Sequence, residues 1–297
     1  METIVNTAFE NALRSKDTTD RAAIKELFSP ASNSYKIPKE MNASYNSALK
    51  KENIFRRYGV EIYAKDCDTI INTVCSTADA DIVDVGKAYP ADSDEFDMMN
   101  FESYKIATLC KISNVLVNEK TFNVTKYLSN EFARRFGRAE EKYFIGGDGN
   151  NQPLGIIHTA DVGVEATGIT YDEIIKLYFS LKPEYRNHAI WVMNDKTALA
   201  LRSLKDGSGN YIWNSTNNTL FGRPVEISNH MPEAEPGNKP VFFGDLSYYW
   251  ILQRDRLCIK PLYEKFGLEG AVGYIANERL DGKLIRKEAV KTMLITA

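Results

Sequence analysis

The longest regular pattern of apolar positions runs from Val124 to Ile145, where apolar side chains recur at steps of three and four. This spacing predicts one amphipathic helix, about 33 Å long for roughly 22 residues, with Asn123 suited to cap its N-terminus. The predicted buried stripe consists of Val124, Leu128, Phe132, Phe136, Ala139 and Tyr143. The opposite face carries Lys126, Arg134, Arg135 and Arg138. Two interpretations of these cations are open, namely pairing within the helix or pairing with another subunit.

The chain before this helix has weaker patterns. Residues 2–30 show broken helical periodicity, and residues 31–59 are rich in Asn and Ser, with one short helix expected. We therefore predict that residues 1–65 form an extended arm, either a solvated linker or a segment laid over a neighbouring subunit. The second interpretation is favoured because several apolar side chains would otherwise be exposed. They are Tyr35, Ile37, Tyr45, Ile54 and Phe55.

Residues 66–104 combine strand-like runs with an acidic middle, which predicts a long hairpin. The acidic residues are Asp79, Asp81, Asp84, Asp92, Asp94, Glu95 and Asp97, and only Lys87 opposes them. A metal cage is a second interpretation, although the glycine and final glutamate of a calcium loop are missing. A two-stranded hairpin is not stable alone in water, so this one needs a basic partner surface. The hypothesis is that Asp92, Asp94, Glu95 and Asp97 pair with Arg134, Arg135 and Arg138 of another subunit.

The glycine-rich stretch after the long helix invites comparison with a phosphate-binding loop. In such loops the glycines precede a helix, whose N-terminus faces the phosphate. Here the glycines follow a helix, and the chain contains no Gly-Lys-Ser/Thr. We predict instead that Gly146 and Gly147 end the helix in a left-handed conformation, that Asp148-Gly149 forms a turn and that Pro153 fixes its exit.

The second half of the chain alternates helix and strand patterns before ending in strands. Thr170 to Glu173 form a capping box, residues 190–193 read as a buried strand, and Asn194 is a further helix cap. Short strands follow, as in YYWILQ and RLCIKPLY. Helices against a mixed sheet, joined to an antiparallel finish, predict an α+β protein. No arrangement of nucleophile, histidine and carboxylate emerges, so the residues indicate a non-enzymatic interaction protein.

Composition narrows the functional classes. The net charge of -3 over 297 residues argues against a dedicated nucleic-acid binder. No export signal or membrane-spanning run is expected, and the scattered Cys67, Cys75, Cys110 and Cys258 are predicted to be free thiols in a reducing compartment. The isolated His158, His188 and His230 lack metal-ligand spacing. We therefore expect neither a metal nor a cofactor.

One ordered series of segments is specific as a whole. It comprises YKIATLCKISNVLVNE, the long helix, YFIGGDGNNQPLGII, AIWVMNDKTALALRSLKDGSGNYIW, TLFGRPVEISNHMP, PVFFGDLSYYWIL and ANERLDGKLIRKEAVKTM. This series resembles the major capsid protein of tailed bacteriophages and prophages, of the Hong Kong 97 type. The resemblance covers about Asp66 to Ala297, and the N-terminal arm less clearly.

The resemblance implies a Hong Kong 97-type capsid fold and assigns its parts. They are an N-terminal arm (1–65), an extended acidic hairpin loop (66–104), a peripheral domain with a long spine helix (105–157), an axial domain (158–276) and a return to the peripheral domain (277–297). The implied function is self-assembly into pentamers and hexamers, which form an icosahedral virion shell around double-stranded DNA in the bacterial host cytoplasm. The implied partners are further copies of the chain, a portal and DNA bound without sequence specificity, with no membrane.

Two departures from the family pattern qualify this expectation. The residues before Pro30 are too few for the scaffolding segment that some members carry, so a separate scaffolding protein is expected. Some members also join subunits by Lys-Asn isopeptide bonds. Lys87 could be a donor, but Gly270 and Asn277 stand where the acceptor and the glutamate would align, so no crosslinking is expected.

Two alternative functions are also considered. An encapsulin-like nanocompartment shell would share the fold and package a cargo enzyme instead of DNA. A nucleotide-dependent enzyme is the alternative of another class, and the order of glycines and helix argues against it.

Overall fold

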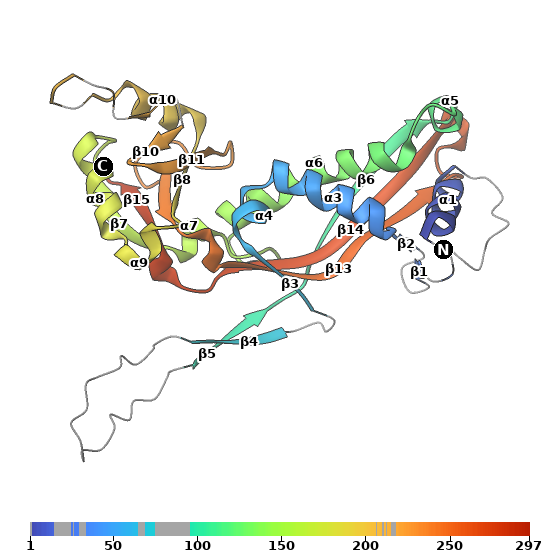
Figure 1. Ribbon diagram of the computed structural model, residues 1–297, viewed down its shortest axis with the longest axis horizontal. Helices are drawn as coiled ribbons and strands as arrows, with labels where there is room; N and C mark the ends of the chain where they lie inside the picture. The colour runs from blue at the N-terminus through green and yellow to red at the C-terminus, as the bar shows by residue number, and fades with distance from the viewer. Residues whose placement is uncertain are drawn as a thin grey trace, which may run out of the picture.

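Helix α6 (Val124–Gly146) lies along the middle of the molecule in the computed structural model (Figure 1). The structure describes residues 2–14, 25, 27–29, 34–64, 69–74, 96–205, 207–209, 211, 213–214 and 218–297. The predicted helix and its cap are confirmed, because the Asn123 side chain accepts a hydrogen bond from the Lys126 amide at 2.8 Å. Without such a cap, the first amides of a helix have no partner.

The buried face of α6 differs from the predicted stripe in its last two turns. Phe136 is buried as predicted, but the buried positions after it are Gly137, Glu140, Glu141, Phe144 and Ile145. Ala139 and Tyr143 are only half-buried, so their place in the predicted stripe is wrong. With 3.6 residues per turn, a step of four from Phe136 to position 140 fits the helix as well as a step of three to position 139. The predicted stripe left position 140 out because Glu140 is charged.

The N-terminal segment packs on its own chain. It contains α1 (Glu2–Leu13), α3 (Lys39–Glu52) and α4 (Ile54–Tyr58), and α3 lies beside α6 (Figure 1). Ile37, Tyr45, Ile54 and Phe55 are at most 5% exposed within the subunit, and Tyr35 is half-buried. The reason for laying this arm over a neighbour is therefore wrong, because its apolar side chains are already covered. The helical pattern predicted across residues 17–30 falls largely outside the described residues.

A six-stranded sheet, called the long sheet, supports α3 and α6. Its path is β1-β2-β13-β14-β6, with β3 pairing beside β13. The strands are β1 (Phe28–Ser29), β2 (Ser34–Lys36), β3 (Val60–Tyr63), β6 (Tyr104–Ser113), β13 (Tyr249–Leu262) and β14 (Ala271–Leu284). The two runs predicted within β13 form one strand, interrupted by register shifts between Gln253 and Cys258. Bulges of this kind hide the continuity of a strand in the sequence.

A seven-stranded mixed sheet with its helices forms the opposite end of the molecule, called the seven-strand unit (Figure 1). Its strands, in sheet order, are β7 (Asp161–Ala166), β15 (Val290–Ile295), β12 (Val241–Gly244), β8 (Ile190–Met193), β11 (Arg223–Ile227), β10 (Thr219–Leu220) and β9 (Trp213–Asn214). Its helices are α7 (Ile156–Thr159), α8 (Tyr171–Ser180), α9 (Pro183–Arg186) and α10 (Asp195–Ser203). The predicted caps Thr170 and Asn194 are confirmed.

Short elements complete the described chain. They are α5 (Asn114–Asn118) at the far end of the long sheet and the 3-10 helices η1 (Leu246–Tyr248), η2 (Gly267–Glu269) and η3 (Lys287–Ala289). A separate two-stranded hairpin consists of β4 (Thr69–Val74) and β5 (Phe96–Phe101). The helices and mixed sheets agree with the predicted α+β class.

The last part of the chain, from Tyr249 onward, passes from one large sheet to the other and back. From Tyr249 the chain leaves the seven-strand unit as β13, returns along β14 in the long sheet, and then adds β15 to the seven-strand unit. These crossings do not coincide with the boundaries predicted at 158–276 and 277–297, and the division into domains stays a prediction. Alternation of apolar residues shows that a strand is half-buried, but it does not show which sheet the strand joins.

The junction of the two sheets is filled with aromatic rings. The ring of Phe55 lies 4.6 Å from that of Tyr249 and 5.6 Å from that of Phe144, measured between centroids. All three side chains are fully buried. The N-terminal segment, α6 and β13 therefore share one core at this point.

Candidate functional site

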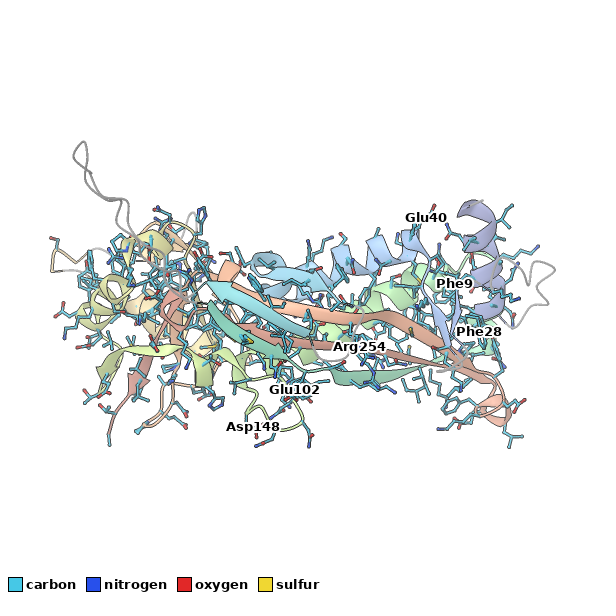
Figure 2. All side chains as sticks on the ribbon, turned by 90° about the horizontal axis from the view of Figure 1, so that it is seen from below. Phe9, Phe28, Glu40, Glu102, Asp148 and Arg254 are labelled. Carbon is cyan, nitrogen blue, oxygen red and sulfur yellow. The ribbon has the colours of Figure 1, made fainter. Side chains whose placement is uncertain are left out.

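The glycine turn after α6 closes on itself instead of opening toward a ligand. Asp148 forms an isolated antiparallel bridge with Leu154, and the Gly155 amide donates to the Gly147 carbonyl at 2.8 Å. The Asp148 carboxylate accepts from the Asn150 amide at 2.9 Å and also from Gln152. Asp148 lies on an exposed loop (Figure 2). The Asp148 carboxylate already accepts hydrogen bonds from the donors of this turn, and its negative charge would repel a phosphate.

The turn's glycines have other roles than predicted. Gly147 has φ -63°, and Gly146 is the last residue of α6, so neither adopts the predicted left-handed conformation. The left-handed residue is Gly149, at φ 82°. Gly147 is required for space, because a Cβ there would overlap the carbonyl oxygen of Pro153. Pro153 thus lies against the end of the helix, in the part of the turn where it was predicted to fix the exit.

The arginines on the exposed face of α6 have partners in their own chain. Arg134 and Arg135 both bind Glu131, with N–O distances of 2.8 and 2.7 Å, and Arg135 also donates to the Leu109 carbonyl. Arg138 lies 3.9 Å from Glu52. Three arginines share two carboxylates here, so a positive charge remains. Pairing with an acidic segment of another subunit stays a prediction.

The acidic segment, residues 79–97, joins the strands of the β4–β5 hairpin. Asp92, Asp94, Glu95 and Lys87 lie outside the described residues. Asp97 lies in β5, where its backbone is opposite Thr73. The hairpin stem leads away from the body of the subunit (Figure 1). The described strands of this stem therefore point away from the α6 of their own subunit.

The root of this hairpin is fastened by residues that the sequence patterns do not single out. The buried Asp281 carboxylate accepts a hydrogen bond from the Glu102 amide at 2.9 Å. Lys283, two residues on, donates to the Asn100 carbonyl. Burial raises the pKa of Asp281 to about 6, against hydrogen bonds from the Glu102 and Gly282 amides and the charge of Lys283, which lower it. Glu102 marks this root in Figure 2.

A buried polar cluster lies under the N-terminal segment and was also missed. It comprises Tyr45, Arg56, Glu140, Gln253 and Glu278, which come from α3, α4, α6, β13 and β14. Arg56 and Glu140 form a two-pronged ion pair, with Nε–Oε2 and Nη2–Oε1 distances of 3.0 and 2.6 Å. Charged residues at apolar-phase positions of α6 are the one sequence signal that could have indicated it.

Large apolar side chains are exposed at both ends of the subunit. Val115 of α5 and Leu268 of η2 are exposed at the far end of the long sheet, where the Asn114 amide donates to the Gly270 carbonyl. Phe179 and Leu199 are exposed on the seven-strand unit. Grouped exposed apolar residues commonly mark protein-protein contacts.

The described residues lack a metal cluster and a membrane-spanning helix, and they include both positions considered for a crosslink. They contain no group of three or more His, Cys, Asp or Glu side chains that could hold a metal ion. They also contain no helix long and apolar enough to cross a membrane. Asn277 is paired within β14, opposite Ala107, and Gly270 ends η2 at φ 61°. Within the described residues, Cys110 and Cys258 are buried and form no disulfide, whereas Cys67 and Cys75 lie outside those residues.

Comparison with known proteins decides between the remaining interpretations. The model of the phage capsid family matches residues 33–295. The chain belongs to the phage capsid family. No curated protein matches it significantly.

Solved capsids share the fold of this phage capsid protein. The capsid of an empty GTA particle matches with a TM-score of 0.70 at 25% identity, over 83% of this chain and 90% of that chain. The capsid of a native GTA particle gives 0.67 at 25% identity, over 82% and 90%. A structure of Gordonia phage Cozz gives 0.60 at 12% identity, over 82% and 87%, and supports the fold alone.

These findings confirm the Hong Kong 97-type capsid fold and the identification with the family. The chain is a major capsid protein of a phage-type head, a structural and non-enzymatic component of the virion capsid. The alternative of an encapsulin-like shell finds no support in them.

Proposed function

We propose that this phage capsid protein assembles into pentamers and hexamers, which close into an icosahedral shell around double-stranded DNA. The observation that carries the proposal is the likeness, at 25% identity, to the GTA capsids computed with C5 symmetry. Head-to-tail contacts between identical subunits generate rings when the rotation closes.

The shape of the subunit supports contacts at both of its ends. Val115 and Leu268 lie at one end, and Phe179 and Leu199 lie on the seven-strand unit at the other. In a ring, the seven-strand units would gather near the axis as the axial domain, and α6 with the long sheet would lie outside it. Many weak contacts of this kind give a stable shell through multivalency.

The β4–β5 hairpin is proposed to reach an adjacent subunit. Its acidic segment would lie against the arginine face of α6 there, where Arg134, Arg135 and Arg138 leave a positive surplus. Opposite charges at a subunit contact fix its register and suppress wrong partners.

The charge of the subunit bears on how tightly the shell would hold DNA. A net charge of -3 does not favour tight phosphate binding, so the inner wall would contain DNA without holding it. A separate scaffolding protein and a portal are proposed as assembly partners. No isopeptide crosslinking is proposed, because a glycine and a paired asparagine occupy the aligned positions.

Electron microscopy of the purified full chain, with its mass in solution, tests the proposal. Rings of five and six subunits or closed particles are expected, alone or after co-expression with a scaffolding protein from the same phage genome. Particles from infected cells should contain nuclease-protected double-stranded DNA. After boiling, the capsid protein of these particles should run in a denaturing gel as a single band at 33.6 kDa. A chain that stays monomeric with scaffold present would contradict the proposal, and a ladder of multimers would contradict the absence of crosslinks.

A further inference from the structure

The buried polar cluster contains one more acid than it has bases to neutralise. The Arg56 and Glu140 side chains are 1% and 0% exposed and pair with each other. Glu140 also accepts from the Asn53 amide group at 2.9 Å. The Glu140 carboxylate therefore accepts hydrogen bonds from three N–H groups, two of Arg56 and one of Asn53.

Glu278 is the additional acid, and it is completely buried in the same cluster. Its Oε2 accepts from the Tyr45 hydroxyl at 3.1 Å and lies 3.5 Å from the Gln253 amide nitrogen. Its Oε1 is buried and has no hydrogen-bond partner within the described part of the chain. Glu140 lies within hydrogen-bonding reach of Glu278.

The groups facing Glu278 come from every element packed around it. They are Tyr45 of α3, Arg56 of α4, Glu140 of α6 and Gln253 of β13, while Glu61 of β3 lies 3.8 Å from Arg56. Arg56 is the single cation among these groups. Glu140 already binds its Nε and Nη2, and its Nη1 donates to Gln253 at 3.2 Å. An ionised Glu278 would be a buried charge without a partner, which proteins avoid by keeping the group neutral.

We propose that Glu278 is a carboxylic acid that shares its proton with Glu140, and that loss of this proton loosens α6 from β14 of the long sheet. The proton supplies the missing partner of Oε1 and removes the excess negative charge. When the proton leaves to solvent, two carboxylates face each other in a buried site. Their repulsion separates the elements that carry them. This device belongs to the single subunit and does not depend on shell assembly.

The direction of the pH dependence follows from the environment of Glu278. Burial, and then the charge of Glu140, raises its pKa well above its usual value, and Arg56 only partly opposes this. A raised pKa in the folded state gives stability that is full below the unfolded value and is lost as pH rises through the folded value. Acid therefore tightens this cluster, and alkali loosens it.

The full-length chain and its Glu278→Gln variant test the proposal. The amide keeps an acceptor for Tyr45 and offers Glu140 an N–H in place of the shared proton, without the ability to ionise. Infrared spectra of the wild type at pH 7 should contain the carbonyl band of a protonated carboxylic acid, and the band should be missing in Glu278→Gln. From this group alone, the wild-type unfolding equilibrium constant should rise about tenfold per pH unit between the unfolded and folded pKa values. Glu278→Gln should lack this component.

Two controls keep the test decisive. Asp281→Asn removes another buried acid of β14, whose pKa of about 6 accounts for a different pH window, so the band at pH 7 should remain. Tyr45→Phe removes a hydrogen bond but not the proton, so the band should remain there as well.

Hydrogen exchange shows which elements respond. Amide protection in α6 and β14, corrected for intrinsic rates, should fall in the wild type as the band disappears with rising pH. A wild type without the band at pH 7, or with unchanged protection when the band is lost, overturns the proposal even if Glu278→Gln does not fold.

Discussion

At the scale of single residues, two adjacent glycines at the end of α6 have opposite tolerances. A Cβ on Gly147 would collide with backbone atoms of Pro153 and Tyr143, whereas a Cβ on Gly146 would meet no heavy atom within 4 Å. Backbone atoms cannot move aside as a flexible side chain can. The pair therefore separates a requirement for space from a preference for glycine at helix ends.

We expect Gly147→Ala to lower the free energy of unfolding by about 1–3 kcal/mol, the usual range for overpacking. Gly146→Ala should be neutral or slightly stabilising, because alanine is the better helix residue by roughly 0.5–1 kcal/mol. Urea denaturation of both variants measures the difference. Equal effects would mean that the approach of Pro153 does not restrict Gly147.

Polar residues show how far residue-scale prediction extends. Asn123, Thr170 and Asn194 could be identified as caps because a cap depends on residues only two or three positions away. Glu278 could not be identified, because Tyr45 and Glu140 meet it only after folding. Asp281 is similar, since Glu102 lies far from it in the chain. Hydrogen bonds between residues close in the chain can be predicted from the sequence, whereas contacts between charged residues far apart in the chain cannot.

At the scale of elements, the buried face of α6 can be tested with two neighbouring aromatic residues. Phe144 is fully buried and its ring centroid lies 5.4 Å from that of Tyr249. Tyr143 was predicted to be buried, but it is half-buried and lies against Lys142.

We expect Phe144→Ala to cost about 3–5 kcal/mol of unfolding free energy, as for other fully buried aromatic rings. Tyr143→Ala should cost roughly 1 kcal/mol, since much of its ring remains in water. Thermal and denaturant unfolding compare the two. A larger loss in Tyr143→Ala would restore the stripe through Ala139 and contradict the observed phase of the helix.

Strands were predicted more reliably than their partners. Residues 190–193 form a completely buried strand, as the run of apolar residues indicates. The sheet membership of β13 and β15 was not predicted, because apolar alternation is the same in either sheet. The arm was misjudged for a related reason, since the sequence shows Tyr45 and Phe55 as apolar without showing which surface covers them.

At the scale of the whole molecule, charge reversal tests the proposed contact between the hairpin and a neighbouring α6. The Arg138 side chain is 62% exposed and its contact with Glu52, at 3.9 Å, is long. Exposed pairs of this kind contribute little to stability. Arg138 can therefore be changed without disturbing the subunit itself.

We expect Arg138→Glu to change the unfolding free energy by less than about 0.5 kcal/mol. It should reduce the yield of rings or shells, measured by sedimentation. Adding Asp94→Lys should restore assembly, and Arg138→Lys, which keeps the charge, should assemble normally. Normal assembly of Arg138→Glu would place the acidic segment on another surface.

The family, the α+β class and the long helix were all predictable, because the order of segments along the chain is specific. The contact surfaces were predictable only as residue types. Arg134 and Arg135 were recognised as exposed cations, but their shared partner Glu131 was not. Exposure of Val115 and Leu268 could not be inferred either, since apolar residues in short helices are buried in most proteins.

The aromatic junction of Phe55, Phe144 and Tyr249 bears on how the subunit could fit a curved shell. In the proposed rings of five and six, the subunit would have to fit two different angles to its neighbours. The three rings pack on one another, and α6, β13 and β14 connect the two sheets there, so this aromatic junction resists bending. Among the described strands, β4 and β5 pair with each other alone, so their stem is the more compliant part. The same subunit would then fit both angles by tilting its hairpin, while the aromatic junction keeps one shape.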